Sequence, residues 1–489
     1  MRFNRKIFRT ILGTIIIFSA GFTTSQCFAQ NQDQKISNFQ YLRKLNRLFE
    51  FVHENYVDET DAKTLYEGAI KGLMNSFNDP YTSYLDHDTI RDLNDTTTGN
   101  FGGVGLTISK PIESKPNKPA YLEVASPIED SPGAKAGIIS GDYITEIDGE
   151  PTEPMTMQQI LDKLRGEVGT PVNVTVLRGK NLKFTVTLIR ELIEVPTVKY
   201  AMIDKIGYLR IIQFTPDTPG RVQEALDDFK SKNYKSLIID LRDNPGGLIT
   251  SVEEIADKFI DNGPIVSTKS RLFTADSVYT ASEEKTVVKN IPIIVLINQG
   301  SASASEILSG ALKDNHLAYL VGQRTYGKGS VQQVIPLGED EAIKMTIARY
   351  YTPSDTNIDK IGIPPDLEIK YPPLTEAEEK AYSALLESNK IDKLIEENPK
   401  MTEEQIRENA EILKKEFNLD ARLLRRLIRM QIWKFETGHI YDLDYDIQLT
   451  AALDILKTKD FKMLVSSTKT LKELQQEAEA MKLSENQAD

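Results

Sequence analysis

Residues 293–306 read IIVLINQGSASASE, an apolar run that passes through a glycine-containing turn into the start of a helix. Five consecutive aliphatic residues, Ile293 to Ile297, are typical of a strand buried on both faces. We expect further strands at residues 207–214 and 236–241, and helices near residues 221–230, 251–260 and 305–312. This alternation of strands and helices predicts an α/β core over residues 195–372.

Three other regions differ from this core in their local pattern. Residues 36–97 have apolar side chains at helical spacing and predict an N-terminal helical region. Residues 98–190 contain short strands punctuated by Gly and Pro, with one helix at 157–164, and predict a compact β-rich domain. Residues 373–489 are almost free of Gly and rich in Glu, Lys, Leu and Ala, which predicts a C-terminal helical region.

The size and charge of the chain limit what it can be. Its 489 residues are too many for one core, which agrees with several domains. The chain has 72 acidic and 59 basic residues, a formal net charge of -13. Because binding to phosphate backbones needs clustered Lys and Arg, we expect no nucleic-acid partner.

The first 29 residues have the order of a secretory signal peptide. Basic residues come first, an apolar run follows from Ile11 to about Phe22, and Cys27-Phe28-Ala29 offers a small-x-small cleavage site after Ala29. We therefore expect an exported, periplasmic or extracytoplasmic protein; an uncleaved membrane anchor is the alternative. Gln26 before Cys27 argues against a lipoprotein. Cys27 is the only cysteine, so cleavage would leave neither a disulfide nor a thiol nucleophile.

Ser303 stands at the turn between the apolar strand and the helix start. A nucleophile at such a corner is exposed, and the first N–H groups of the helix can hold an oxyanion. The same residues would also suit an ordinary serine-rich helix N-cap, so the segment alone leaves both interpretations open.

A serine hydroxyl needs a base to become a nucleophile. The four histidines are His53, His87, His316 and His439, and only His316 is near Ser303, at the far end of the expected helix. A Ser-His-Asp triad is therefore poorly supported. Lys328, in the Gly-rich segment 325–330, is the better base, provided that its surroundings lower its pKa from about 10.4 towards 7 or 8.

The segment around Lys328 is also similar to a phosphate-binding P-loop, because Gly322 and Gly327-Lys328 have the spacing of the glycines and the lysine in that motif. Gly329 stands where Ser or Thr would hold magnesium, and residues 331–335 predict a strand in place of the required helix. These two departures argue against a nucleotide site.

Three segments together resemble the signature of the carboxy-terminal processing peptidases, also called tail-specific proteases. They are Gly300–Ile307 (GSASASEI), Asp240–Gly247 (DLRDNPGG) and Tyr326–Gln332 (YGKGSVQ). The resemblance covers roughly residues 36–372 and implies a ClpP/crotonase-like core. It also implies that Ser303 is the nucleophile, Lys328 the base and Gln332 the residue that orients the lysine.

The turn Asn244–Gly247 follows an expected strand, and its glycines can bring N–H groups close to a substrate. The resemblance implies that Gly246 or Gly247, together with the amide of Ala304, forms the oxyanion hole. An ordinary β-turn is the alternative. Asp314 matches a further family position, where a capping or structural role is as reasonable as a catalytic one.

The β-rich domain resembles a PDZ domain. Phe101–Ile108 (FGGVGLTI) is similar to its carboxylate-binding loop, which implies that Gly103, Val104, Gly105 and Leu106 hold a peptide terminus. Residues 131–144 and 147–149 are similar to further PDZ segments. Arg165, after the helix, either couples this domain to the core or simply faces solvent.

We therefore expect a serine endopeptidase with a Ser-Lys dyad that cleaves proteins near their C-termini after its PDZ domain has bound the tail. The expected partners are proteins with apolar C-terminal tails, and a second copy of the chain through the helical regions. No metal or organic cofactor is implied. Two alternatives are a PDZ scaffold whose core only binds, and a conventional serine hydrolase that uses His316.

Overall fold

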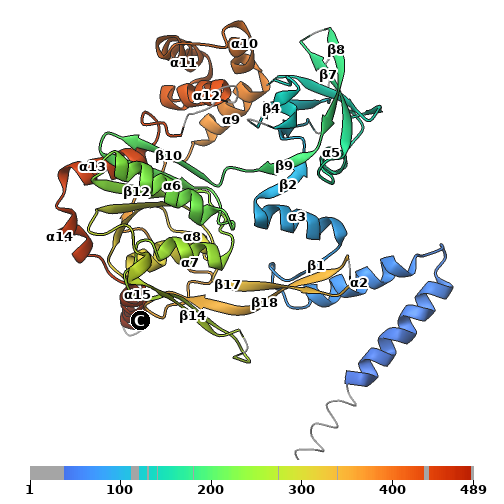
Figure 1. Ribbon diagram of the computed structural model, residues 1–489, viewed down its shortest axis with the longest axis horizontal. Helices are drawn as coiled ribbons and strands as arrows, with labels where there is room; N and C mark the ends of the chain where they lie inside the picture. The colour runs from blue at the N-terminus through green and yellow to red at the C-terminus, as the bar shows by residue number, and fades with distance from the viewer. Residues whose placement is uncertain are drawn as a thin grey trace, which may run out of the picture. The chain divides into compact units, whose positions relative to one another are not determined.

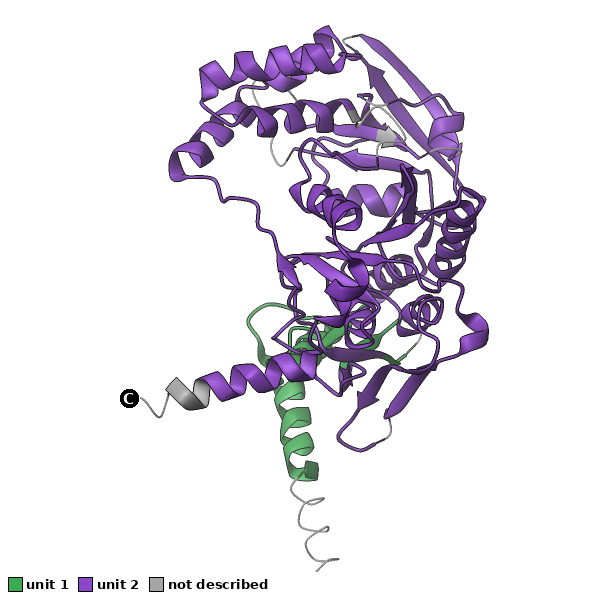
Figure 2. Cartoon of the chain, turned by 90° about the vertical axis from the view of Figure 1, so that its left-hand side faces the viewer, with its two compact units in different colours: residues 1–86, 334–345 green, residues 87–333, 346–489 purple. Residues whose placement is uncertain are grey.

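The computed structural model describes residues 38–485 except for 112–119, 129–130, 140, 180, 274, 339 and 434–439. It has a mixed α/β, multidomain fold (Figure 1). The chain divides into two units, coloured in Figure 2: residues 1–86 with 334–345, and residues 87–333 with 346–489. The expected signal peptide, residues 1–29, lies outside the described residues.

The first unit confirms the predicted N-terminal helices. A helix spans residues 38–55, and α2 spans Ala62–Asn75 after Asp61, whose side chain caps it by accepting the N–H of Thr64. The short strand β1, Ser83–Leu85, pairs antiparallel with residues 342–344 of β18, Ala342–Tyr351. In the described part of the chain, no helix is both long enough and apolar enough to cross a bilayer.

The second unit begins with α3, His87–Thr98, and continues into the β-rich domain. Its main sheet has the order β3-β4-β5-β7-β8, so β3 lies at one edge. The helices of this domain are α4, Pro132–Lys135, and α5, Met157–Leu164. The strands are β3 (Leu106–Ser109), β4 (Leu122–Pro127), β5 (Tyr143–Ile147), β7 (Pro171–Arg178) and β8 (Leu182–Ile189), with β6 (Glu150–Pro151) beside β5. A separate ribbon pairs β2, Asn100–Gly103, with β9, Glu191–Glu194.

The predicted α/β core is built on a six-stranded sheet. Its order is β10-β11-β12-β15-β16-β19, and all neighbours are parallel except β10 and β11. The strands are β10 (Val198–Ile203), β11 (Ile206–Ile211), β12 (Ser236–Asp240), β15 (Ile293–Ile297), β16 (Ala318–Gly322) and β19 (Leu367–Glu368). A second sheet joins β13, Gly263–Lys269, to β14, Ser277–Ala281, and to residues 349–351 of β18; β17, Ser330–Pro336, also pairs with β18.

Both faces of the core sheet are buried, which explains the uninterrupted apolar strands. One face packs against α6 (Thr218–Ser231), α7 (Ile249–Ala256) and α8 (Ala304–Asp314). Alternate residues of the strands, such as Ile238 and Ile294, point to the other face, where they pack with Leu449 and Ala452 of α13, Ile447–Thr458. Figure 1 shows these helices on the two sides of the sheet.

The C-terminal region is helical, as predicted, but its helices have local partners. The sequence analysis expects the helical regions to contact a second copy of the chain. Helices α9 (Glu376–Glu387), α10 (Lys390–Glu397), α11 (Glu403–Phe417) and α12 (Ala421–Trp433) bury a separate apolar cluster between them. Beyond them, α13 and α14 (Phe461–Ser466) cover the sheet, and α15 (Leu471–Glu485) packs against α8 through Leu471.

Candidate active site

The main chain at Ser303 is strained. An ordinary N-cap residue is extended, as Thr156 is before α5 with φ -71° and ψ 161°. Ser303, directly before α8, has φ 55° and ψ -114°, a conformation that is rare for a residue with a side chain and that recurs at functional sites. Ser303 is half-buried. This geometry departs from the simple N-cap alternative.

The loop after β12 packs directly against this corner. Gly246 has φ +105°, and a Cβ atom on it would lie 2.7 Å from both the carbonyl oxygen of Ala302 and the Cβ of Ser303. The carbonyl of Asn244 accepts hydrogen bonds from the N–H of Ala302 at 3.0 Å and the hydroxyl of Ser305 at 2.9 Å. Only a glycine fits at position 246 without moving the serine turn.

The N–H groups around this corner differ in their partners. The N–H of Gly246 donates to Asn244 Oδ1 at 2.9 Å and is therefore engaged. Across the described residues, the N–H groups of Gly247 and Ala304 have no hydrogen-bond acceptor. Two unengaged donors beside a strained serine are what an oxyanion site requires.

The Lys328 loop is tied to the serine turn by one buried carboxylate. Glu306, in the first turn of α8, is fully buried. Its Oε2 accepts the N–H groups of Ser303 at 2.9 Å and Lys328 at 2.8 Å. Since both N–H groups bond to one oxygen, the two main-chain nitrogens lie no more than about 6 Å apart.

The other carboxylate oxygen of Glu306 binds residues that precede Lys328 in the same loop. Oε1 accepts the hydroxyl of Thr325 at 2.5 Å and the N–H of Gly327 at 2.8 Å. Burial raises the pKa of Glu306, while these hydrogen bonds oppose that rise by favouring the ionised form. The hydroxyl of Tyr350 adds a second link: it bonds to the carbonyl of Lys328 and lies 3.3 Å from that of Ser303.

Gln332 lies on β17, two residues after the buried Ser330. Its Nε2 donates to the hydroxyl of Ser330 at 2.9 Å and is 3.4 Å from that of Thr346. The P-loop alternative is wrong for this segment. The N–H groups of Gly327 and Lys328, which a phosphate would need, bond to Glu306, and the chain continues as a strand.

His316 lies beyond the opposite end of α8 from Ser303. Eleven helical residues, Ala304–Asp314, separate them, a length of roughly 16 Å at 1.5 Å per residue. The Nδ1 atom of His316 is 3.0 Å from the hydroxyl of Thr468. The carboxylate of Asp314 accepts the N–H groups of Leu471 and Ser354, which indicates a structural role.

Arg165 joins the β-rich domain to α3. Its Nη1 atom is 2.8 Å from Asp92 Oδ1 and 3.2 Å from Asp95 Oδ2, and its guanidinium lies over the ring of Phe101. Burial raises the pKa of Asp95, against the pull of Arg165. The solvent-facing alternative does not describe this side chain.

The four residues of the predicted carboxylate-binding loop run from the end of β2 to the start of β3. The carbonyls of Val104 and Gly105 accept the N–H of Gly133 and the hydroxyl of Ser131, both at 2.9 Å. The N–H groups of Val104 and Gly105, both buried residues, have no acceptor in the described part of the chain. Gly103 precedes them in β2, and Leu106 opens the edge strand β3.

The sequence analysis missed Glu306, Tyr350 and Arg242 as members of this site. Glu306 stands three residues after Ser303, the spacing of a capping box, which was the available signal. Arg242 donates to both oxygens of Asp240 at 2.9 and 2.6 Å and so anchors the start of the glycine loop.

Comparisons with known proteins show which families this chain is similar to. The chain matches the family model "Peptidase family S41" over residues 205–369, "Activating protease CtpB N-terminal domain" over 16–89 and "PDZ domain" over 123–178. It is 39% identical over 373 residues to the carboxy-terminal-processing protease of Bartonella bacilliformis, which covers 75% of this chain and 83% of that protein. It is 31% identical over 375 residues to the carboxy-terminal processing protease CtpA of Bacillus subtilis, covering 76% and 78%. A solved structure, the photosystem II D1 C-terminal processing protease, is 26% identical, covers 66% of this chain and 91% of that one, and has a TM-score of 0.41.

Proposed function

Since this chain belongs to the carboxy-terminal processing proteases of peptidase family S41 and is a serine-type peptidase, we propose that Ser303 is its nucleophile and Lys328 its base. The observation that carries this proposal is the Glu306 oxygen that binds the N–H groups of both residues. It supports a dyad because it fixes two segments that are 25 residues apart in the sequence to one point.

In the proposed reaction, Ser303 Oγ attacks the carbonyl carbon of a peptide bond and its proton passes to the neutral amine of Lys328. The oxyanion that forms accepts hydrogen bonds from the N–H groups of Ala304 and Gly247, which have no acceptor among the residues that the structure describes. Gly246 supports this loop but does not bind the oxyanion, because its own N–H donates to Asn244 Oδ1. The ammonium then protonates the leaving amine, and Lys328 activates the water that releases the acyl group. Gln332 is the proposed orienting residue for the lysine.

The test is cleavage of an unfolded protein with an apolar C-terminal tail, followed by mass spectrometry of the products. Ser303→Ala and Lys328→Ala should each lower the rate by at least about a thousandfold, because a nucleophile or its base is lost. The matched controls Ser466→Ala and Lys400→Ala change exposed residues and should retain the wild-type rate. His316→Ala should also be fully active. A dyad variant that cleaves at the wild-type rate would refute the assignment.

We also propose that the PDZ domain selects the substrate by its C-terminus. The N–H groups of Val104 and Gly105, which have no acceptor among the described residues, can donate hydrogen bonds to a terminal carboxylate, with Gly103 and Leu106 on either side of them in the loop. The tail can then add to β3, which lies at the edge of its sheet. Protein substrates with apolar tails fit this mode of binding.

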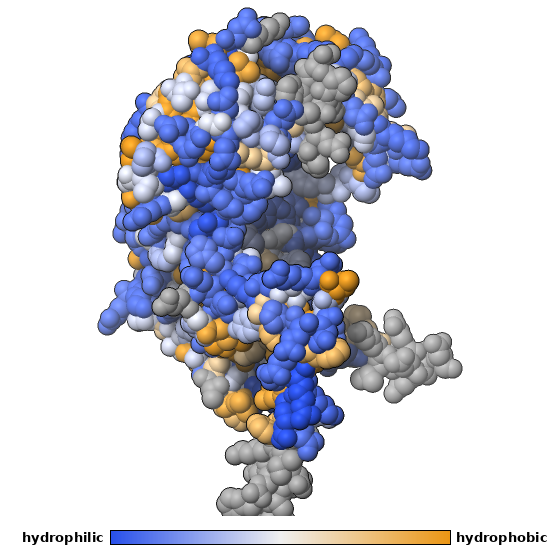
Figure 3. Space-filling model, turned by 90° about the vertical axis from the view of Figure 1, so that its right-hand side faces the viewer, coloured by the Kyte–Doolittle hydropathy of each residue, from blue (hydrophilic) through white to orange (hydrophobic). Residues whose placement is uncertain are grey.

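Export and self-association complete the proposal. The N-terminal sequence is that of a signal peptide or a membrane anchor, so the protein would act outside the cytoplasm. On the face shown in Figure 3 hydrophilic residues predominate. The helix over residues 38–55 nonetheless exposes large apolar side chains such as Leu42, Leu45 and Phe51, which suits contact with a second copy.

A further inference from the structure

Arg242 stands where the C-terminal region meets the loop proposed to hold the oxyanion. It follows β12 by two residues, and its side chain is 11% exposed. Its Nε and Nη2 atoms donate to the two oxygens of Asp240, at 2.9 and 2.6 Å. Burial alone would raise the pKa of Asp240, but Arg242 holds that pKa below its ordinary value. These two hydrogen bonds lie within the core, because Asp240 is the last residue of β12.

The other half comes from a residue 204 positions later in the chain. Asp446 accepts Arg242 Nη1 at 2.8 Å and Nη2 at 2.6 Å. Gln448 Oε1 accepts Nη1 at 3.0 Å, and the amide of Gln448 donates to the carbonyl of Ile369. A guanidinium has five N–H donors, and here all five have an acceptor. Two of these hydrogen bonds go to Asp240 in the core, and the other three go to Asp446 and Gln448 in the C-terminal region.

Arg242 is connected through the main chain of the residues that follow it to the loops proposed to be catalytic. Asp243, the next residue, donates its N–H to Asn298 Oδ1, which also accepts the N–H of Gly300 in the serine turn. Asn244 then bonds to Ala302 and Ser305. A movement of Arg242 would therefore move the segment that ends in Gly246 and Gly247.

We propose that Asp446, assisted by Gln448, is a positioning residue for catalysis: the C-terminal region holds Arg242 and thereby fixes the oxyanion loop. This inference rests on the proposed Ser-Lys mechanism. It assigns a role in the chemical step to a region that lies outside the residues matched by the peptidase family model.

The decisive variant is Asp446→Asn. Asp446 also caps α13 by accepting the N–H of Leu449 at 2.9 Å, and Asn caps a helix as well as Asp does. The substitution therefore keeps the cap and removes the charge, and one of the two bonds to Arg242. The matched control is Asp460→Asn: Asp460 caps α14 through the N–H of Met463, and among the described residues it has no arginine partner.

The assay measures kcat and KM of the full chain on the tailed substrate. A fluorophosphonate labels Ser303 to completion, and kcat is expressed per labelled serine. In Asp446→Asn we expect kcat to fall about tenfold to a hundredfold with KM within about twofold, because a displaced oxyanion donor weakens the transition state more than substrate binding. Gln448→Ala should lower kcat in the same direction by a smaller factor, and Asp460→Asn should match the wild type.

The outcomes separate this inference from the function it rests on. A wild-type protein that does not cleave would overturn the proposed function and this inference with it. An active wild type together with an Asp446→Asn variant of unchanged kcat would overturn the inference alone. A variant that loses only labelled protein, with normal kcat per labelled serine, would show a merely structural role and overturn it as well.

Discussion

At residue 246 the space available to a side chain decides whether the serine turn can form. A Cβ atom there would meet Ala302 O and Ser303 Cβ at 2.7 Å and Ala304 N at 2.9 Å, and the φ of +105° disfavours any residue except glycine. We predict that Gly246→Ala lowers kcat at least about a hundredfold, because the clash would displace the neighbouring N–H groups of Gly247 and Ala304 that are proposed to bind the oxyanion.

The control for this prediction is Gly220→Ala, because no atom lies within 4 Å of an added Cβ in the first turn of α6. Alanine favours a helix over glycine by roughly 0.5–1 kcal/mol, so this variant should be fully active and slightly more stable. Steady-state kinetics and thermal unfolding of both variants check the pair. A Gly246→Ala protein with wild-type kcat would contradict the packing argument.

The contacts that Glu306 makes with the Lys328 loop could not be predicted from the sequence. Its spacing from Ser303 indicated a contact within one helix start. Its bonds to Gly327 and Lys328 join segments 21 and 22 residues apart, and no local pattern encodes such a pairing. The proposed nucleophile and base could be named from the sequence because their residue types are chemically restricted, whereas a structural carboxylate is recognised only by its partners.

At the scale of elements, the strands and helices of the core were predictable because each carries its own apolar period. The surface that each helix of the C-terminal region covers was not predictable, since an apolar face does not identify its partner. Leu449 and Ala452 of α13 pack on the strands, while Ile406 and Ala410 of α11 pack on neighbouring helices. Each of these helices buries apolar side chains, and apolar side chains in the sequence do not identify the surface that covers them.

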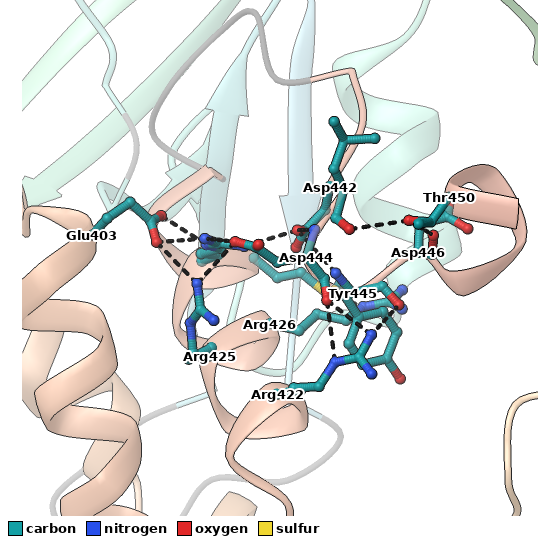
Figure 4. A network of polar contacts seen from close by, with 12 residues as sticks. Glu403, Arg422, Arg425, Arg426, Asp442, Asp444, Tyr445, Asp446 and Thr450 are labelled. Atoms are coloured by element: carbon teal, nitrogen blue, oxygen red, sulfur yellow. Dashed lines mark hydrogen bonds and ion pairs between the residues drawn. The ribbon is translucent and has the colours of Figure 1, made fainter. Parts of the chain in front are cut away.

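A cluster of charges attaches α11 and α12 to the segment before α13. Arg429, 8% exposed, bonds to Glu403, to Asp442 Oδ1 at 2.8 Å and to Asp444 Oδ2 at 2.6 Å. Figure 4 shows Glu403, from α11, in one network of polar contacts with Asp442 and Asp444, from the segment before α13. The hydrogen bonds from Arg429 lower the pKa of both Glu403 and Asp444.

This cluster predicts an acid-sensitive stability. A carboxylate whose pKa is lowered in the fold stabilises it above the unfolded pKa of about 4 and loses that effect as the pH falls through the folded value. We expect Arg429→Met to lower the free energy of unfolding at pH 7 by about 1–3 kcal/mol. The difference from the wild type should disappear near pH 2.

Denaturant unfolding followed by the fluorescence of Trp433 measures this, because Trp433 ends α12 and is the only tryptophan in the sequence. Arg407→Met, at an exposed position of α11, is the control and should follow the wild type at every pH. A stability difference that persists unchanged in acid would show that Arg429 contributes by packing and not by its charge.

At the scale of the whole molecule, recognition and chemistry are assigned to different domains, so they should be separable by substitution. Gly105 has φ +67°, and a Cβ atom there would lie 2.1 Å from Ser131 Cβ, so Gly105→Ala must distort the loop that presents its N–H groups. For the wild type we expect amidation of the substrate's C-terminus to raise KM about tenfold, the worth of hydrogen bonds to a charged group.

In Gly105→Ala the free and amidated substrates should have the same, higher KM, while kcat at saturation stays within about twofold of the wild type because the core is unchanged. Gly179→Ala is the matched control: its φ of +61° imposes the same backbone strain, but an added Cβ meets nothing within 4 Å. That variant should still distinguish the two substrates. If amidation leaves the KM of the wild type unaffected, the PDZ loop does not bind the carboxylate, and tail selection has to arise in the peptidase core itself.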